Sequence, residues 1–258
     1  MMRMLTLVTA VALAACNPTP KTINGKVTDI WGKPVENATV QLVDAAAPAT
    51  SGADGSFSFP RPEAAGALKF TAGKDGFIKN SSEVMMPEDT TGFSPAIKMY
   101  PIPDGMGFFA IGASDYIPVN PVQLKTTGTD LGAYTGLPSD PEAVTASQEF
   151  IFSSTSSASE LSRLNLKLHR LEFKPSATVT GVTGDQEVTL NLFVATDAIP
   201  YDIQVLPRDN YFLINPRDEL ESGHYAFSTQ GVLGSSDPET LANLPVELQV
   251  AHPFQIKR

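Results

Sequence analysis

His169 and Glu172 are the two residues whose types and spacing most directly suggest chemistry. An imidazole and a carboxylate three residues apart could ligate zinc. Catalytic zinc needs three protein ligands and an open position, so His224 or His252 would have to complete the site. The sequence around these two histidines shows no supporting motif.

The segment that must position the pair argues against a metal site. Leucine occupies every second position of Leu164–Leu168, which predicts a strand. Residues three apart on a regular strand point to opposite faces, so His169 and Glu172 would diverge. Only a bulge or a strand end at Arg170 would bring them together. We therefore predict no metal, no cofactor and no catalytic residue here.

The acidic residues could support glycoside hydrolysis or Ca²⁺ binding, but no motif in the sequence singles out a particular pair or site. Residues 101–258 contain nineteen Asp and Glu, and a pair of them could serve as the acid and base of a glycosidase. Asp197 with Asp202 or Asp209 could bind Ca²⁺, but no Asp-x-Asp-x-Asp-Gly loop is present. A solvated acidic surface is the preferred interpretation.

Motifs of nucleophilic and phosphate chemistry are missing from the sequence. It contains no Gly-x-Ser-x-Gly elbow and no phosphate-binding glycine loop. Trp31 and Tyr134, if exposed, could stack on sugars, although Trp31 lies in a predicted turn and is expected to pack there. The sequence therefore favours a protein that is not an enzyme.

Cys16 is the chain's one cysteine, and it ends an N-terminal secretory signal. Arg3 supplies the charged start, and the uncharged run Leu5–Ala15 follows. A run of about 11 residues is too short to cross a membrane as a helix. Leu13-Ala14-Ala15-Cys16 resembles the lipobox of bacterial lipoproteins. The resemblance implies cleavage between Ala15 and Cys16, removal of residues 1–15, and acylation of Cys16.

Acylation would hold the chain on a lipid bilayer, because each buried methylene contributes about 0.8 kcal/mol. Residues 16–21 then form a short tether, in which Asn17-Pro18-Thr19-Pro20 is stiff and extended. By its similarity to bacterial lipoproteins, Asn17 after the cysteine implies sorting to the outer membrane. Whether the chain faces the periplasm or the cell surface is left open.

Composition indicates an all-β chain of two domains after the tether. The 258 residues include 21 Pro and 19 Gly, which suits many turns. Pro and Gly interrupt the apolar pattern near Pro101, so we divide the chain into residues 22–100 and 101–258. Residues 101–258 carry nine Lys and Arg against nineteen Asp and Glu. That acidic balance argues against nucleic acid as a partner.

The first domain reads as alternating strands joined by tight turns. Ile23–Val27 alternates apolar and polar residues, and Ser56–Phe59 places Phe57 and Phe59 on one face. The turn residues that we single out are Gly25, Gly32, Pro34, Asp54, Gly55 and Gly76. The segment from Ser81 to Gly92 shows no clear strand pattern, and we expect the last strand at Ala96–Met99.

The order of these pieces resembles the carboxypeptidase regulatory-like (transthyretin-like) domain. The resemblance rests on Gly25-Lys26-Val27-Thr28-Asp29, Gly32-Lys33-Pro34-Val35, Ala38-Thr39-Val40, Ala53-Asp54-Gly55-Ser56-Phe57 and Gly76-Phe77. It implies a seven-stranded Greek-key β-sandwich related to carbohydrate-binding-like folds. It carries over no catalytic residue, because the family is usually an accessory to another domain.

Residues 101–258 resemble no family that we recognise, and we expect a second β-sandwich. A turn is expected at Gly181–Asp185, and a short helical turn at Ser236–Glu239, whose letters Ser139–Glu142 repeat. The expected strands are Gly107–Ile111, Phe150–Phe152, Leu164–Phe173, Glu187–Val194, Tyr211–Ile214, His224–Ser228 and Val246–Val250.

The sequence thus predicts a non-catalytic outer-membrane lipoprotein whose β-sandwich modules bind or scaffold a partner in the cell envelope. Its partners would be the bilayer, through acylated Cys16, and an envelope protein or a glycan. The alternative is a carbohydrate-binding lipoprotein that uses a sandwich face, with a hydrolase third.

Overall fold

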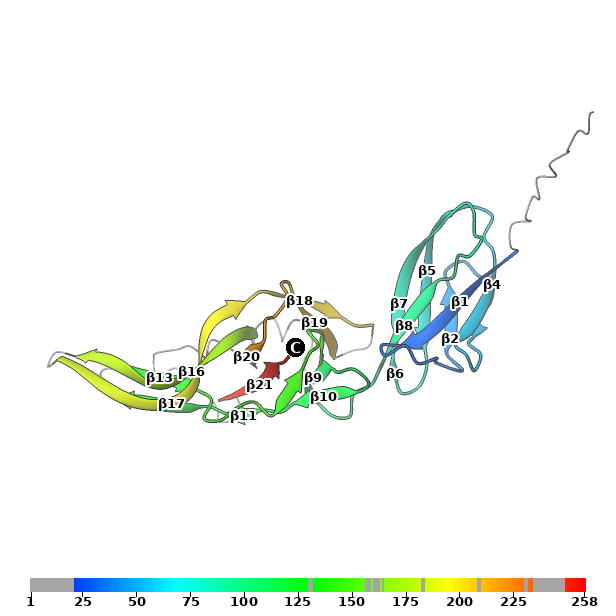
Figure 1. Cartoon of the computed structure of the whole chain (residues 1–258). Coiled ribbons are helices and arrows are strands. Elements are labelled where there is room, and N and C mark those ends of the chain that lie inside the picture. The colour runs from blue at the N-terminus through cyan, green and yellow to red at the C-terminus, as the bar shows by residue number, and fades with distance from the viewer. Residues whose placement is uncertain are drawn as a thin grey trace, which may run out of the picture.

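The chain is built from β-strands in two domains that lie end to end (Figure 1). This computed structural model describes residues 21–129, 132–155, 159, 163, 165–181, 184–207, 210–229, 232–233 and 249–258. The all-β prediction is confirmed. Within these residues, no helix has the length and apolar character needed to cross a membrane.

The first domain is a sandwich of two four-stranded sheets, with strand orders β4-β1-β8-β6 and β3-β2-β5-β7. Two of its strands, β3 and β6, are only two residues long. The bounds are β1 Thr22–Asp29, β2 Thr39–Leu42, β3 Ala49–Thr50, β4 Ser56–Pro60, β5 Gly66–Gly73, β6 Phe77–Ile78, β7 Asn80–Met86 and β8 Ala96–Pro101.

Alternating side chains build the core of this first domain. Strands β1 and β4 bury every second residue, as the sequence pattern predicts. Phe57 and Phe59 are both buried and pack against Phe70 of the other sheet, with ring centroids 5.8 and 6.2 Å from it. The apolar faces of the two sheets therefore close on each other.

Gly55 occupies the tight turn before β4 with φ of 76°. Asp54 accepts a hydrogen bond from the Ser56 amide at 3.0 Å. A Cβ on Gly55 would lie 2.3 Å from the carbonyl oxygen of Val27, so the site excludes any side chain. Pro34 forms a bridge to Thr28, which closes the neighbouring turn.

The other predicted turn glycines differ in their physical role. Gly32 and Gly76 both have φ of 82° and open space where a Cβ would stand, so backbone conformation alone favours glycine there. Gly25 lies inside β1 and is not in a turn. A Cβ at Gly25 would lie 2.2 Å from the Phe57 ring, so close packing explains that glycine.

The expectation of no strand between Ser81 and Gly92 is wrong. Strand β7 covers Asn80–Met86 and pairs with β5 along its length. Its pattern was hidden because the exposed face combines Ser81 and Glu83 with Met85, and the other face is only half-buried up to Val84. Strand β8 also extends two residues beyond the expected Met99.

The second domain stacks a five-stranded sheet, β10-β9-β15-β19-β18, on a larger one, β11-β21-β20-β16-β17, to which β14 adds beside β21. Strands β12 and β13 form a separate hairpin. The bounds are β9 Gly107–Ile111, β10 Tyr116–Val119, β11 Val122–Gln123, β12 Lys125–Thr129, β13 Gly132–Gly136, β14 Ala143–Thr145, β15 Phe150–Ser153, β16 Lys167–Gly181, β17 Gly184–Ile199, β18 Tyr201–Val205, β19 Tyr211–Pro216, β20 Gly223–Ser228 and β21 Val250–Ile256.

Aromatic side chains from both sheets fill the core of the second domain. Phe108 of β9 stacks on Phe227 of β20, with centroids 4.6 Å apart and ring planes within 6°. Phe150 of β15 lies 4.7 Å from Phe254 of β21. The core therefore lies between the two sheets, which makes this domain sandwich-like as expected.

A long hairpin, here called the arm, projects from the second domain (Figure 1). The arm is the part of the β16–β17 hairpin that runs from Glu172 in β16 to Val194 in β17. The β12–β13 hairpin packs against it, and we count it as part of the arm. Leu190, Leu192 and Val194 are buried, and Tyr134 packs against them. Tyr134 is thus half-buried against a small core and does not line the arm-base cavity described below.

Several predicted boundaries in the second domain need correction. Strand β16 begins at Lys167, after Leu164 and Leu166, and it runs on to Gly181. Strand β17 is twice the expected length, because it starts at Gly184 and continues past Val194 to Ile199, where it still pairs with β16. Strand β21 begins where the expected strand Val246–Val250 ends. The helical turn predicted at Ser236–Glu239 lies outside the described residues, as do the side chains of Leu164 and Asp209.

Candidate functional site

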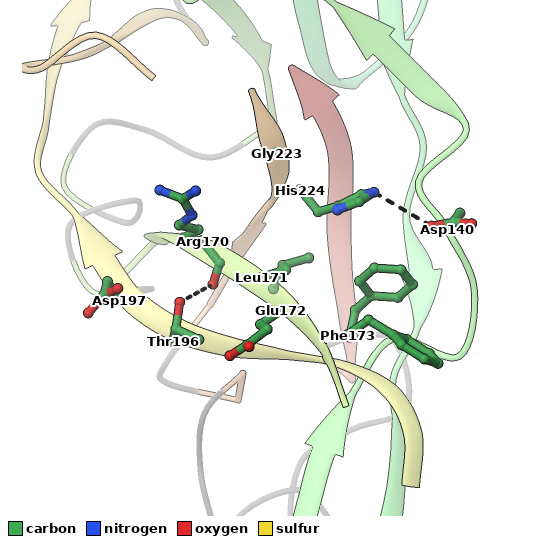
Figure 2. Close-up of a pocket in the computed structure, with 10 residues that line it drawn as sticks. Asp140, Arg170, Leu171, Glu172, Phe173, Thr196, Asp197, Gly223 and His224 are labelled. Carbon is green, nitrogen blue, oxygen red and sulfur yellow. Dashed lines mark hydrogen bonds and ion pairs between the residues drawn. The ribbon is translucent and has the colours of Figure 1, made fainter. Parts of the chain in front are cut away.

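An open cavity of about 830 Å³ lies at the base of the arm, and we call it the arm-base cavity. Strands β16, β17 and β20 form most of it, and the loop between β13 and β14 closes one side. Its lining residues are Asp140, Arg170, Leu171, Glu172, Phe173, Phe193, Thr196, Asp197, Gly223 and His224. Figure 2 shows Arg170, Glu172, Thr196 and Asp197 on one side and Asp140, Phe173 and His224 on the other.

An irregularity at Arg170 shapes this cavity. The register of β16 with β17 shifts between His169 and Leu171, which is the bulge that the metal hypothesis required. Despite the bulge, only Glu172 of the pair lines the cavity, and His169 is not one of its lining residues. The described residues contain no group of three or more His, Cys, Asp or Glu that could hold a metal ion.

His169 is instead a half-buried strand residue between Ala198 and Ala226. Its Nε2 atom is buried and has no hydrogen-bond partner among the described residues. Burial lowers the pKa of His169, and the neighbouring Lys167 charge lowers it further. A neutral imidazole is therefore the favoured state at this position.

One wall of the arm-base cavity is polar. The Arg170 guanidinium donates to Glu221 at 2.9 Å, and this hydrogen bond is the main reason that its pKa is raised. Thr196 donates its hydroxyl to the Arg170 carbonyl at 3.4 Å, which ties β17 to β16 across the bulge. Asp197 adds a further negative charge beside the guanidinium. This wall offers both donors and acceptors to a ligand.

The other wall is aromatic. Phe173 is half exposed, at 50%, whereas Phe193 beside it is only 7% exposed. Their ring centroids are 5.2 Å apart. His224 lies 4.8 Å from the Phe193 ring and places Nε2 3.6 Å from an Asp140 carboxylate oxygen. The exposed ring of Phe173 gives a ligand a flat apolar surface at the rim.

Ser139–Glu142 repeats the letters of the helical turn predicted at Ser236–Glu239, and the shared letters would imply the same helix capping at Asp140, but no helix begins there. Residues 139–142 form irregular backbone, and the carboxylate of Asp140 reaches His224 instead. Asp202, considered for Ca²⁺, pairs with Arg217 at 2.9 Å on the surface. Asp197 lines the arm-base cavity, and Asp202, its suggested partner in binding Ca²⁺, is not among the lining residues.

Two further predicted residues lie away from the cavity. Trp31 does not offer an exposed ring to a sugar, because it packs against the second domain. His252 is half-buried, and its ring is tilted against that of Phe108 with centroids 4.7 Å apart. Its Nδ1 lies 3.0 Å from the Val119 carbonyl oxygen. The lipidation and cleavage residues, Cys16 and Ala15, lie outside the described residues.

Sequence reasoning missed most of the residues that line the cavity. Arg170 and Phe173 were visible only as members of a strand, and their exposure depends on the bulge and on where the arm leaves the sheet. Asp140 approaches His224 from a loop 84 residues earlier in the chain. No local pattern encodes such a contact.

The fold and the cavity define a two-domain, all-β protein with an open hollow in its second domain. Residues 22–94 match the family model of the carboxypeptidase regulatory-like domain, and the first domain is of that kind. The resemblance drawn from its turn motifs is thereby confirmed.

Among solved structures, the chain is similar to a DUF3823 family protein from Bacteroides ovatus, with 14% identity and a TM-score of 0.26, covering 92% of this chain and 100% of that one. It is also similar to a DUF3823 family protein from Parabacteroides merdae, with 12% identity and a TM-score of 0.23, covering 93% and 100%. TM-scores this low assign neither a fold nor a function. The comparison with curated proteins found no match.

Proposed function

We propose that the chain is a non-catalytic binding protein, held on the outer membrane by acylated Cys16, and that its ligand occupies the arm-base cavity. The observation that carries this proposal is the cavity's mixed lining. A half-exposed phenylalanine faces hydrogen-bonding groups that are held in place by strands. Apolar surface combined with a few placed polar groups is typical of ligand sites.

The charges around the cavity narrow the choice of ligand. Asp140, Glu172 and Asp197 are acidic, and the guanidinium of Arg170 is already paired with Glu221. Anionic ligands would meet a net negative surface, so an uncharged or cationic ligand fits better.

The anchoring half of the proposal rests on the sequence Leu13–Cys16. Cys16→Ala should leave an uncleaved precursor and abolish labelling with radioactive palmitate in cells, because no other cysteine is present. Equal labelling of the wild type and the variant would contradict lipid anchoring. A Ser154→Ala variant, far from the signal, serves as the matched control for expression.

The second candidate function is carbohydrate binding, with a neutral carbohydrate as the ligand of the arm-base cavity. The exposed ring of Phe173 favours this function. Sugars stack their apolar face on aromatic rings and exchange hydrogen bonds with carboxylates and guanidinium groups. A glycan array that contains neutral and uronate-containing oligosaccharides tests this candidate. We expect neutral glycans to be retained and uronate-containing ones to be repelled. Retention of uronates alone would contradict it.

A further inference from the structure

The end of the first domain at which β1 begins has an unusual surface, and we call it the tether end. Strand β1 starts at Thr22 opposite Pro60, and the Arg61 amide donates to the Lys21 carbonyl at 2.9 Å. Strands β2 and β4 end here, and β5 begins here. The loops that follow β2 and β4 therefore surround the point at which the chain enters the domain.

These loops enclose an apolar hollow of about 600 Å³. Alanine and proline dominate its lining, together with Val43, which is 53% exposed. Met85, near the end of β7, pairs with Ala67 at the same end of the sandwich and is 70% exposed. The lining residues of the hollow are Leu42, Val43, Asp44, Ala45, Ala46, Ala47, Pro48, Ala49, Ser58, Phe59, Pro60, Arg61, Pro62 and Glu63.

The opposite end of the same domain is already covered. Trp31 and Ile30 pack against residues of the second domain there, as does Tyr100. Figure 1 shows the start of β1 at the end of the first domain that is remote from the second. An exposed apolar surface of this kind marks a contact with a partner or a membrane.

The length of the chain before Lys21 decides what covers the tether end. Four residues, 17–20, lie between Cys16 and Lys21, so even a fully extended tether reaches only about 18 Å. If Cys16 is acylated, its alkyl chains lie in the bilayer, and the tether end is held close to the headgroups. The second domain and the arm then lie on the far side of the first domain from the bilayer.

We propose that the tether end is a membrane-contact surface, in which Val43 and Met85 enter the interfacial layer of the bilayer that holds Cys16. This inference rests on the proposed lipid anchor. Lys21 and Arg61 are balanced by Asp44 and Glu63, so the surface has no basic excess. The contact is therefore apolar and takes zwitterionic lipid, without the need for anionic headgroups.

The test uses the full-length lipidated chain, in which acylated Cys16 leaves an introduced cysteine as the one free thiol. Val43→Cys and Met85→Cys are labelled with an environment-sensitive fluorophore, and Asp75→Cys, at the opposite end, is the matched control. Each protein is reconstituted into phosphatidylcholine–phosphatidylethanolamine vesicles. Some vesicles contain lipid that carries a doxyl quencher near the headgroup.

We expect a blue shift and severalfold stronger doxyl quenching at Val43 and Met85 than at Asp75. Adding phosphatidylglycerol should not increase the quenching. Flotation with the vesicles is measured on the same samples. Flotation with equal quenching at all three positions would overturn the membrane-contact surface alone. Loss of flotation would overturn the lipid anchor. Quenching that requires phosphatidylglycerol would overturn the apolar nature of the contact.

Discussion

Trp31 of the first domain donates its indole N–H to the carbonyl oxygen of Gly112 in the second domain at 2.9 Å. Its ring meets Tyr116 edge-on, with centroids 5.1 Å apart. Tyr116 in turn donates its hydroxyl to the Pro101 carbonyl at 2.9 Å. Burial raises the pKa of Tyr116, so the hydroxyl stays protonated and keeps this bond. The two domains are thus joined by specific contacts as well as by the connecting chain.

Trp31→Ala should weaken the coupling between the domains. It removes one hydrogen bond and one aromatic contact, which together contribute about 2 kcal/mol. In calorimetry we expect the unfolding transition to broaden or split, with Trp31→Phe showing a smaller effect because it keeps a ring. An unchanged single transition in Trp31→Ala would show that the contact does not couple the domains.

Gly55→Ala and Gly32→Ala form a matched pair, because both glycines have positive φ and only Gly55 meets backbone. Gly32→Ala should cost about 1 kcal/mol through backbone strain alone. Gly55→Ala should cost about 3 kcal/mol, because its Cβ collides with the Val27 carbonyl. Urea unfolding of the two variants measures the difference. Equal losses would mean that the turn relaxes around the new side chain.

Stability should fall as the pH falls through the range in which histidine titrates. Burial is the main cause of the lowered pKa of both His169 and His252. The unfolded chain binds protons near pH 6.5, whereas the folded chain binds them only at lower pH, so protons favour unfolding. The free energy of unfolding should thus be lower at about pH 5 than at about pH 7.5. His252→Gln should flatten this dependence, and an unchanged slope in that variant would contradict the assignment.

The purified chain should contain no stoichiometric zinc, despite the spacing of His169 and Glu172. Chelator should leave the melting temperatures of the wild type and of His169→Ala unchanged. Metal analysis that finds one zinc per chain, lost in His169→Ala, would revive the enzyme hypothesis.

Much of the first domain could be predicted because its determinants are local. Phe57 and Phe59 alternate with serine, and Asp54 with Gly55 specifies a turn, so a few neighbouring residues encode strand, face and connection. Strand β7 was missed because polar and apolar residues do not separate onto its two faces, and because it lacks β-branched residues at most positions.

The cavity and the domain contact could not be predicted, because each depends on residues that are distant in sequence. Trp31 meets a carbonyl 81 residues away, and nothing near Trp31 marks that partner. The bulge at Arg170 depends on the pairing of β16 with β17 and changes which side chains reach solvent. Hydrophobic periodicity treats such a strand as regular, so Phe173 was not predicted to be exposed.

Titration of the purified chain with neutral oligosaccharides, followed by mass analysis of the recovered ligand, tests the proposed non-catalytic binding at the arm-base cavity most directly. Phe173→Ala removes the exposed ring, and Val205→Ala on β18 removes an equally exposed apolar side chain elsewhere. We predict that the wild type and Val205→Ala bind alike, that Phe173→Ala binds about tenfold more weakly, and that the ligand is recovered intact. Binding unaffected by Phe173→Ala would contradict the arm-base cavity as the site, and release of shortened products would contradict the non-catalytic role. Absence of oligosaccharide binding would contradict the neutral-carbohydrate candidate.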